Sequence, residues 1–174
     1  MEQQQKTIWT VGHSTQSAEE FINILKQHHI KLLVDVRRFP GSRKFPWFNQ
    51  EVLKKDLQEH EINYSHIGEL GGRRKPNPNS ENTVWRHPAF RAYADFMESD
   101  EFEIGVKELE LLAKAQATAI MCSEVLWWRC HRSMIADYLK TEGWEVMHIL
   151  SKEKSTEHPY TKPANVVAGK ITYH

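Results

Sequence analysis

The sequence predicts an α/β fold, a single-domain layered sandwich in which a mostly parallel five-stranded sheet is flanked by helices. Short β-branched runs alternate along the chain with longer segments whose apolar residues have a helical period. The 174 residues suit one domain with its own core, and neither a linker nor an internal repeat divides them. We expect a flexible N-terminus over residues 1–6, the α/β domain over residues 7–150, and a C-terminal tail over residues 151–174 packed on the same domain.

The first half of the chain contains three predicted strands and two predicted helices. Ser17 and Glu20 have the spacing of a capping box and precede a helical apolar face. Asn49 is placed to cap a second helix. The second strand is almost wholly apolar, as expected of a buried parallel strand. The strands are expected at residues 7–11, 31–36 and 62–67, and a long polar loop follows at residues 68–87.

The second half of the chain contains three further helices and two further strands. Pro88 stands at the first position of a segment with helical period, where proline is well tolerated. Gly143 follows another such segment, which begins at Cys130, and is expected to end that helix. The helices are expected to begin at Pro88, to surround residues 106–112, and to span residues 130–142; the strands are expected at residues 117–122 and 145–149.

Polar and reactive side chains follow the predicted strands at the points where the strands end. The carboxyl ends of parallel strands share one edge of a sheet, and ligands bind in the crevice outside that edge. The strand starts have no comparable cluster, so we expect the functional site at the carboxyl edge. The side chains at these ends are those of His13, Ser14, Asp35, Arg37, Arg38, His66, Cys122, Ser123 and Glu124.

Charge is distributed unevenly, although 23 basic and 23 acidic side chains cancel over the whole chain. Residues 37–91 contain eleven basic and six acidic side chains, so an anionic partner is expected there. Within this part, residues 37–48 interleave four cations with four aromatic residues. Guanidinium groups make bidentate hydrogen bonds to phosphate oxygens, and aromatic rings stack on bases. This segment therefore suits a nucleotide or a single-stranded nucleic acid. The alternative is a loop whose aromatic residues only anchor it to the core.

Cys130 is the candidate nucleophile. We expect it at the start of a helix, where the helix dipole and the neighbouring Arg129, His131 and Arg132 would stabilise a thiolate. The alternative is that Cys122 and Cys130 are buried as small apolar residues. A further interpretation is a metal site built from Cys122, Cys130 and His131, although their spacing differs from that of most structural zinc sites.

Two carboxylates near the expected edge are candidates for proton transfer. Glu124 follows a strand end and is surrounded in the sequence by arginines; its alternative role is a salt bridge to Arg129 or Arg132. Asp35 is either a catalytic carboxylate or the partner that orients Arg37, and the partner role is favoured because structural ion pairs are common.

The predicted site combines these catalytic candidates with a larger set of binding residues. Gly71 and Gly72 are included because glycine lets the backbone approach a ligand closely. The catalytic residues are expected to be Asp35, Glu124, Cys130 and His131. The substrate is expected to contact His13, Ser14, Arg37, Ser42, Arg43, Tyr64, His66, Gly71, Gly72, Arg73 and Arg132.

These residues favour an enzyme that acts on a phosphorylated or nucleotide-like substrate, because anion capture alone needs fewer ionisable types. They assign no reaction class and identify no cofactor. One alternative is a binding module for single-stranded nucleic acid or a nucleotide, without catalysis, and the other is the metal site. The expected partner is an anionic small molecule or a nucleotide, with nucleic acid as the alternative, and no membrane partner is expected.

The expected location is the cytoplasm. The chain has only two cysteines, too few for a disulfide scaffold. Its first residues lack the apolar core of a signal peptide, and no apolar run approaches the roughly 20 residues that span a bilayer.

A series of short motifs runs along the chain: Val11–Ser14, Val34–Arg37, Ser42–Arg43, Tyr64 with His66, Leu70–Gly72, Met121–Glu124, Cys130–Arg132 and Ile171–Tyr173. In this order they resemble domain-of-unknown-function family 488, from about residue 7 through the tail. The resemblance implies a compact α/β domain in a cytoplasmic, mostly prokaryotic protein, and it implies no reaction. The family often has a proline between the Glu and the Cys-His-Arg, where Trp127 or Trp128 stands here.

Overall fold

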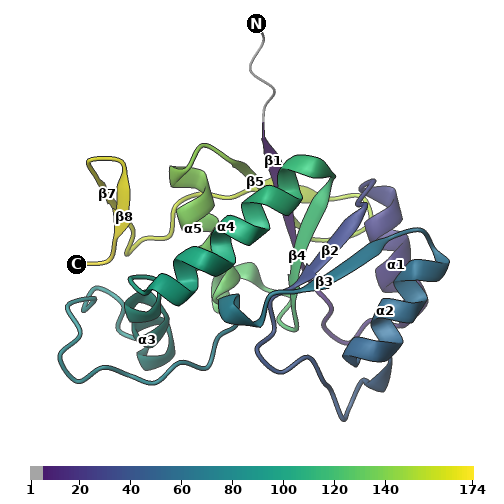
Figure 1. Ribbon diagram of the computed structural model, residues 1–174, viewed down its shortest axis with the longest axis horizontal. Coiled ribbons are helices and arrows are strands. Elements are labelled where there is room, and N and C mark those ends of the chain that lie inside the picture. Colours follow the sequence, from purple (N-terminus) through teal and green to yellow (C-terminus); the bar gives the residue numbers. More distant parts are fainter. Residues whose placement is uncertain (1–5) are drawn as a thin grey trace, which may run out of the picture.

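The computed structural model describes residues 6–174, which form a central twisted sheet with helices on both of its faces (Figure 1). The predicted α/β sandwich with a mostly parallel sheet is confirmed. The flexible N-terminus expected at residues 1–6 lies outside the described residues, apart from Lys6.

Six strands form the sheet, in the order β3-β2-β4-β1-β5-β6. The strands are β1 Thr7–Gly12, β2 Leu32–Asp35, β3 Asn63–His66, β4 Thr118–Cys122, β5 Glu145–Ile149 and β6 Ser155–Glu157. The first five pair in parallel, and β6 is antiparallel to β5. The expectation of five strands is therefore corrected, because the tail returns to the sheet edge at β6 and pairs Thr156 with His148. A three-residue strand is too short to give a recognisable period-2 pattern in the sequence.

The two faces of the sheet pack against different helices because side chains alternate along each strand. In β2, Leu33 belongs to the core of one face, whereas Leu32 and Val34 belong to the core of the other. The first face packs against α1 Ala18–Gln27 and α2 Gln50–Glu59, and the second against α3 Pro88–Phe96, α4 Asp100–Ala115 and α5 Arg132–Thr141. The β-strand order thus places the carboxyl ends of β1, β2 and β4 side by side, between the two helical layers.

Local sequence signals set most of the helix ends. The Ser17 side chain accepts a hydrogen bond from the backbone N–H of Glu20 at 3.1 Å, as the capping pattern predicts. Pro88 is the first residue of α3, and Gly143 follows α5 with a φ of 94°, a left-handed conformation that favours glycine. Asn49 precedes α2, but its Oδ1 accepts from the backbone N–H of Ser42 at 2.6 Å and so fixes the preceding loop instead of capping the helix.

The C-terminal tail adds β6 and a separate hairpin of β7 Asn165–Val167 and β8 Lys170–Thr172. Tyr173, directly after β8, is buried in the core cluster of the second face, together with residues of α3, α4 and α5. Among residues 6–174, none of the helices combines the length and the apolar character needed to cross a membrane.

Candidate functional site

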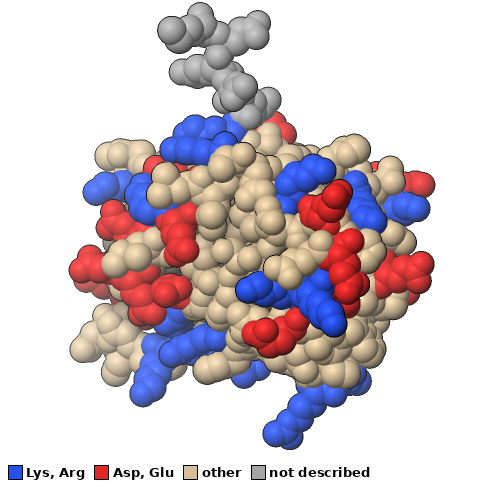
Figure 2. Space-filling model, turned by 45° about the vertical axis from the view of Figure 1, so that its right-hand side comes forward, with Lys and Arg blue, Asp and Glu red and all other residues tan. Residues whose placement is uncertain are grey.

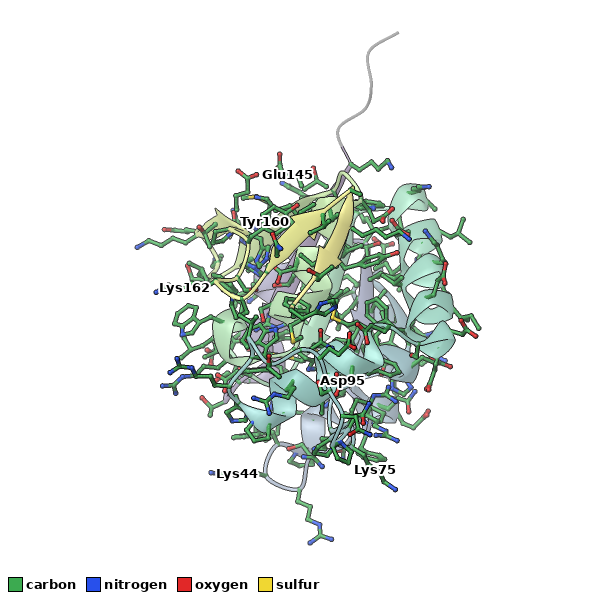
Figure 3. The ribbon with its side chains drawn as sticks, turned by 90° about the vertical axis from the view of Figure 1, so that its left-hand side faces the viewer. Lys44, Lys75, Asp95, Glu145, Tyr160 and Lys162 are labelled. Carbon is green, nitrogen blue, oxygen red and sulfur yellow. The ribbon has the colours of Figure 1, made fainter. Side chains whose placement is uncertain are left out.

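A cavity of about 630 Å³ lies outside the carboxyl ends of β1, β2 and β4. Five cationic side chains and one carboxylate line it: those of Arg37, Arg38, Lys44, Arg73, Arg129 and Glu124. Lys44 and Lys75 lie at the lower end of the molecule, opposite Glu145 at the start of β5 (Figure 3). Lys and Arg side chains also project from this lower end in Figure 2. The cavity is therefore electropositive and occupies the edge at which ligands of such sheets bind.

His13 stands directly after β1 and lines the cavity. Its Nδ1 donates to the Ser14 carbonyl at 2.9 Å, and its ring stacks on Phe48 with the centroids 4.2 Å apart. Burial lowers the pKa of His13, against the opposing effect of the Ser14 carbonyl. The imidazole is therefore neutral near pH 7. Its Nε2 then carries a lone pair, and this buried atom has no hydrogen-bond partner among the described residues.

Gly12, the last residue of β1, is required because the loop that follows the neighbouring strand β4 approaches it closely. A Cβ at this position would lie 1.9 Å from the carbonyl oxygen of Glu124. This contact lets the backbone of His13 and Ser14 pair with that of Cys122 and Ser123, through N···O distances of 3.0 and 2.9 Å. The cavity wall formed by the ends of β1 and β4 therefore depends on glycine.

Arg37 projects from the end of β2 and is held by Asp35. Its Nε and Nη2 donate to the two carboxylate oxygens of Asp35 at 2.9 and 2.8 Å, and Nη2 also donates to the Phe48 carbonyl. Tyr64 donates its hydroxyl to the same carboxylate at 2.6 Å. Asp35 is fully buried and does not line the cavity, so in this structure it orients Arg37. The third guanidinium nitrogen of Arg37, Nη1, has no partner among the described residues.

The mouth of the cavity combines an exposed aromatic ring with two cations. Phe39 is 63% exposed, and the guanidinium groups of Arg38 and Arg73 lie 5.6 and 6.0 Å from its ring centroid. Arg38 also donates to the Arg73 carbonyl at 2.8 Å, which joins the loop after β2 to the loop after β3. This arrangement places an exposed aromatic ring beside two positive charges.

The two adjacent glycines of the loop after β3 allow it to pack tightly. A Cβ at Gly71 would lie 2.5 Å from the backbone nitrogen of Arg38, and one at Gly72 would lie 3.1 Å from Nδ1 of His131. Gly72 lines the cavity, whereas Gly71 lies beneath the Arg38 backbone. The glycine pair therefore brings the loop against both the β2 end and the start of α5.

Cys122, at the end of β4, and Cys130, just before α5, lie side by side at the base of the cavity with their sulfur atoms 2.7 Å apart. Burial raises the pKa of Cys122, which keeps it a thiol. Burial also acts to raise the pKa of Cys130, but the hydrogen bond from Cys122 and the nearby His131 and Arg132 lower it well below its usual value. The pKa shifts of the two cysteines are therefore opposite, and Cys130 is the one whose thiolate form is favoured.

The start of α5 supplies the other neighbours of this sulfur. The backbone N–H of Arg132 donates to Sγ of Cys130 at 3.5 Å, and Nδ1 of His131 lies 3.7 Å from it. The N-terminus of the helix favours negative charge at this point. The buried Nε2 of His131 has no partner among the described residues, and its ring lies against Tyr93.

The metal interpretation does not fit this geometry. Two thiolates on one tetrahedral zinc ion lie about 3.7 Å apart, because each Zn–S bond is about 2.3 Å long. The sulfur atoms of Cys122 and Cys130 are much closer than this. Residues 6–174 contain no group of three or more His, Cys, Asp or Glu side chains arranged to hold a metal ion.

Glu124 lies at the cavity, as expected, whereas Arg132 does not. Glu124 lines the cavity, and its Oε1 accepts from the backbone N–H of Leu126 at 3.1 Å; no salt bridge to an arginine forms within the described residues. Arg132 is 1% exposed and does not line the cavity. Its guanidinium donates to Thr10 Oγ1 and to the carbonyls of Glu124 and Val125, so it fixes the loop that carries Glu124.

The structure brings most of the predicted site residues together. Those that line the cavity are His13, Ser14, Arg37, Ser42, Gly72, Arg73, Glu124, Cys130 and His131, with Cys122 beside them. Those that do not line it are Asp35, Arg43, Tyr64, His66, Gly71 and Arg132. Tyr64 donates to Asp35, and His66 donates to the Arg37 carbonyl at 2.7 Å, so both support the β2 end from the neighbouring strand.

Sequence reasoning missed two parts of this region. Ala89, Phe90 and Tyr93 of α3 close one side of the cavity, although nothing in their own segment indicates a ligand site. A buried polar chain behind the cavity was also missed; the only signal for it was the high histidine content. It runs from Arg132 through Thr10, His148 and His158 to Asp137.

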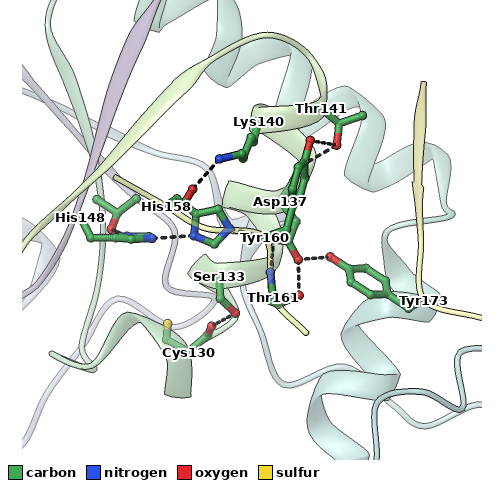
Figure 4. A network of polar contacts seen from close by, with 11 residues as sticks. Cys130, Ser133, Asp137, Lys140, Thr141, His148, His158, Tyr160, Thr161 and Tyr173 are labelled. Atoms are coloured by element: carbon green, nitrogen blue, oxygen red, sulfur yellow. Dashed lines mark hydrogen bonds and ion pairs between the residues drawn. The ribbon is translucent and has the colours of Figure 1, made fainter. Parts of the chain in front are cut away.

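The part of this buried chain that runs from His148 through His158 to Asp137 is seen in Figure 4. The Asp137 carboxylate accepts from Nε2 of His158 at 2.7 Å, and Nδ1 of His158 is hydrogen-bonded to Nε2 of His148 at 2.8 Å. Nδ1 of His148 is in turn hydrogen-bonded to the Thr10 hydroxyl at 2.6 Å. Burial, together with the charges of His158 and Arg132, lowers the pKa of His148 to about 2, which keeps this ring neutral.

Comparison with known protein families gives one match. The family model of the domain of unknown function DUF488 matches residues 17–139, from the N-cap of α1 into α5. The matched residues include the ends of β2, β3 and β4 and both cysteines, whereas the motifs Val11–Ser14 and Ile171–Tyr173 extend beyond them. No curated protein and no solved structure matches the chain.

Proposed function

This chain belongs to the DUF488 family, whose name carries no activity, and we propose that it is an enzyme acting on a phosphorylated or nucleotide-like substrate at the carboxyl edge of its sheet. The observation that carries the proposal is the position of Cys130, a cysteine with a lowered pKa, on a cavity lined by five cationic side chains. Cation-lined clefts attract anionic ligands, and a thiolate is a strong nucleophile.

Anion binding is supported by the state of the lining groups. Arg37 is held rigidly by Asp35 and keeps Nη1 unpaired, which prepares one donor for a ligand oxygen. Arg38, Arg73 and Lys44 line the more exposed part of the cavity and add positive charge around it. Phosphate oxygens match such forked and preorganised donors.

Catalysis, beyond capture of an anion, is supported by three groups with different chemistry. The Cys130 thiolate is available for nucleophilic attack on the bound substrate. Neutral His13 presents an unpaired Nε2 as a base, and Glu124 offers a carboxylate on the same wall. A binding pocket for anions needs neither a thiolate nor a neutral imidazole, and both disfavour the binding of negative charge alone.

The experiment that tests this function is a turnover assay on nucleoside mono- and diphosphates and sugar phosphates, with products identified by mass spectrometry. We expect the wild-type protein to convert at least one of these compounds. Cys130→Ala should bind the same compound with similar affinity and lose turnover, because the anion-binding side chains remain. Conversion that is unchanged in Cys130→Ala would contradict the assigned nucleophile, and the absence of both turnover and binding would refute the proposal.

A second candidate function is the binding of single-stranded nucleic acid without catalysis. It is favoured by Phe39, whose exposed ring lies beside Arg38 and Arg73, because stacking of a base on such a ring contributes about 1–3 kcal/mol. Oligonucleotide affinity that falls steeply with salt, needs Phe39 and tolerates both Glu124→Ala and Cys130→Ser would favour this alternative. Affinity confined to mononucleotides would favour the enzyme.

A further inference from the structure

Cys122 and Cys130 form a pair of free thiols whose side chains face each other. Their sulfur atoms are 2.7 Å apart, with no atom between them, and both residues line the base of the cavity. Cys122 also lies 3.7 Å from the Glu124 carbonyl, to which its thiol can alternatively donate. Two cysteines in direct contact at the floor of an open cavity are placed for reaction with each other and with a small molecule that enters it.

We propose that this pair is a site of reversible oxidation, at which a hydroperoxide oxidises Cys130 and Cys122 then closes an intramolecular disulfide. In the first step the Cys130 sulfur attacks the outer oxygen of the hydroperoxide. The O–O bond breaks, an alcohol or water leaves, and a sulfenic acid forms at Cys130. In the second step the Cys122 sulfur attacks the sulfenic sulfur, and the hydroxyl leaves with the Cys122 proton as water. Over both steps, two thiols lose two electrons and two protons, and one hydroperoxide is reduced.

The two cysteines have different roles because their surroundings differ. Cys130 receives a hydrogen bond from the backbone N–H of Arg132 and lies beside His131 at the start of a helix, which stabilises negative charge on its sulfur. Cys122 ends a fully buried strand, and among the described residues no backbone N–H donates to its sulfur. Attack on the peroxide therefore belongs to Cys130, and Cys122 resolves the product before further oxidation occurs.

The fold also favours reversal of the bond. The two cysteines are eight residues apart in the sequence, so a disulfide between them closes a short loop and constrains the unfolded chain little. Such a disulfide is less protected from reduction than one that closes a long loop. Its formation would remove the Cys130 thiolate from the cavity, so on the proposed function oxidation stops turnover and reduction restores it.

The test uses intact-mass measurement of the full-length protein after treatment with hydrogen peroxide, followed by maleimide labelling under denaturing conditions. We expect the wild-type chain to become about 2 Da lighter and to lose both labelling sites, and dithiothreitol to restore both. Cys122→Ser should instead accumulate a sulfenic acid at Cys130 that dimedone traps, because the serine hydroxyl cannot resolve it. Cys130→Ser should leave Cys122 reduced and at least about tenfold slower to oxidise.

Three results would overturn the proposal: two labelled thiols that persist in the wild-type protein after peroxide, sulfinic acid at Cys130 while Cys122 stays reduced, or a disulfide that joins two chains. The wild-type measurement needs no variant, so it remains decisive if a substitution prevents folding. Because the readout is mass and not turnover, failure of this proposal is distinguishable from failure of the proposed function.

Discussion

The guanidinium of Arg37 holds both carboxylate oxygens of Asp35 at 2.9 and 2.8 Å, and the pair is almost completely buried beneath the cavity. Tyr64 donates to the same carboxylate, so three elements converge on one ion pair: the end of β2, the loop that follows it, and β3. The pair sets the direction of the one guanidinium nitrogen that has no partner within the described residues. The direction in which Arg37 offers this donor to an anion is therefore set by buried residues below the cavity, and not by residues at its surface.

Removal of the charge on Asp35 should destabilise the protein strongly. Asp35→Asn leaves the buried Arg37 charge without its counterion, and we expect a loss of about 3–5 kcal/mol in the free energy of unfolding. Tyr64→Phe is the matched control, since it removes one hydrogen bond and should cost about 1 kcal/mol. Urea unfolding of both variants measures the difference, and equal losses would contradict the ion-pair account.

Substitution of Gly12 should distort the cavity wall. Gly12→Ala places a Cβ 1.9 Å from the Glu124 carbonyl, so the β4 loop must move, and we expect a cost of at least about 1–3 kcal/mol. Gly41→Ala is the control, because the nearest atom to its Cβ would be 3.7 Å away. Thermal unfolding of the two variants checks this, and a Gly12→Ala protein as stable as Gly41→Ala would contradict the observed close approach.

Acid should destabilise the fold through His148. The pKa of this ring is about 2 in the folded protein and about 6.5 when unfolded, so below pH 6.5 the unfolded chain binds a proton that the folded chain does not. Stability from this group is present above pH 6.5 and falls toward pH 2, by about 1.4 kcal/mol per pH unit. His148→Gln should flatten the dependence of unfolding free energy on pH, whereas His29→Asn, at an exposed residue with a φ of 57°, should retain it. Parallel curves for the two variants would contradict this assignment.

The two thiols should differ in their reactivity with pH. Alkylation of Cys130 by iodoacetamide should rise less steeply with pH than that of an ordinary thiol, because its pKa lies below the usual value. Cys122→Ala removes the donating thiol and should restore the steeper rise in rate with pH; serine is unsuitable here because its hydroxyl would still donate. The site of labelling is read by peptide mass spectrometry, and preferential labelling of Cys122 would reverse the assignment.

Much of the fold follows from local patterns in the sequence. The apolar run of β2 and the capping pattern at Ser17 each indicate their own element without information from elsewhere in the chain. The rule for parallel sheets then brings His13, Arg37 and Cys130 to one edge, although they are far apart in sequence. The location of the cavity was therefore predictable from the sequence.

The details of the site depend on contacts that local patterns do not encode. The sequence suggests that Arg132 is a free cation, but its guanidinium donates hydrogen bonds to Thr10 and to two backbone carbonyls. Thr10 and His148 are separated by 138 residues, and their contact exists only because β1 and β5 are neighbours in the sheet. The orientation of such side chains and the short strand β6 follow from tertiary packing, so no hydrophobic period or sequence motif indicates them.

The most direct test of the account is protection of Cys130 from alkylation by a nucleoside monophosphate. We expect iodoacetamide labelling of Cys130 to slow saturably as the nucleotide is added, because the thiolate lies at the base of the cavity that binds it. Arg73→Gln should weaken the protection, whereas Arg43→Gln, at an exposed cation outside the cavity lining, should not. A labelling rate that is unchanged by nucleoside monophosphates, nucleoside diphosphates and sugar phosphates alike would contradict a phosphorylated ligand in this cavity.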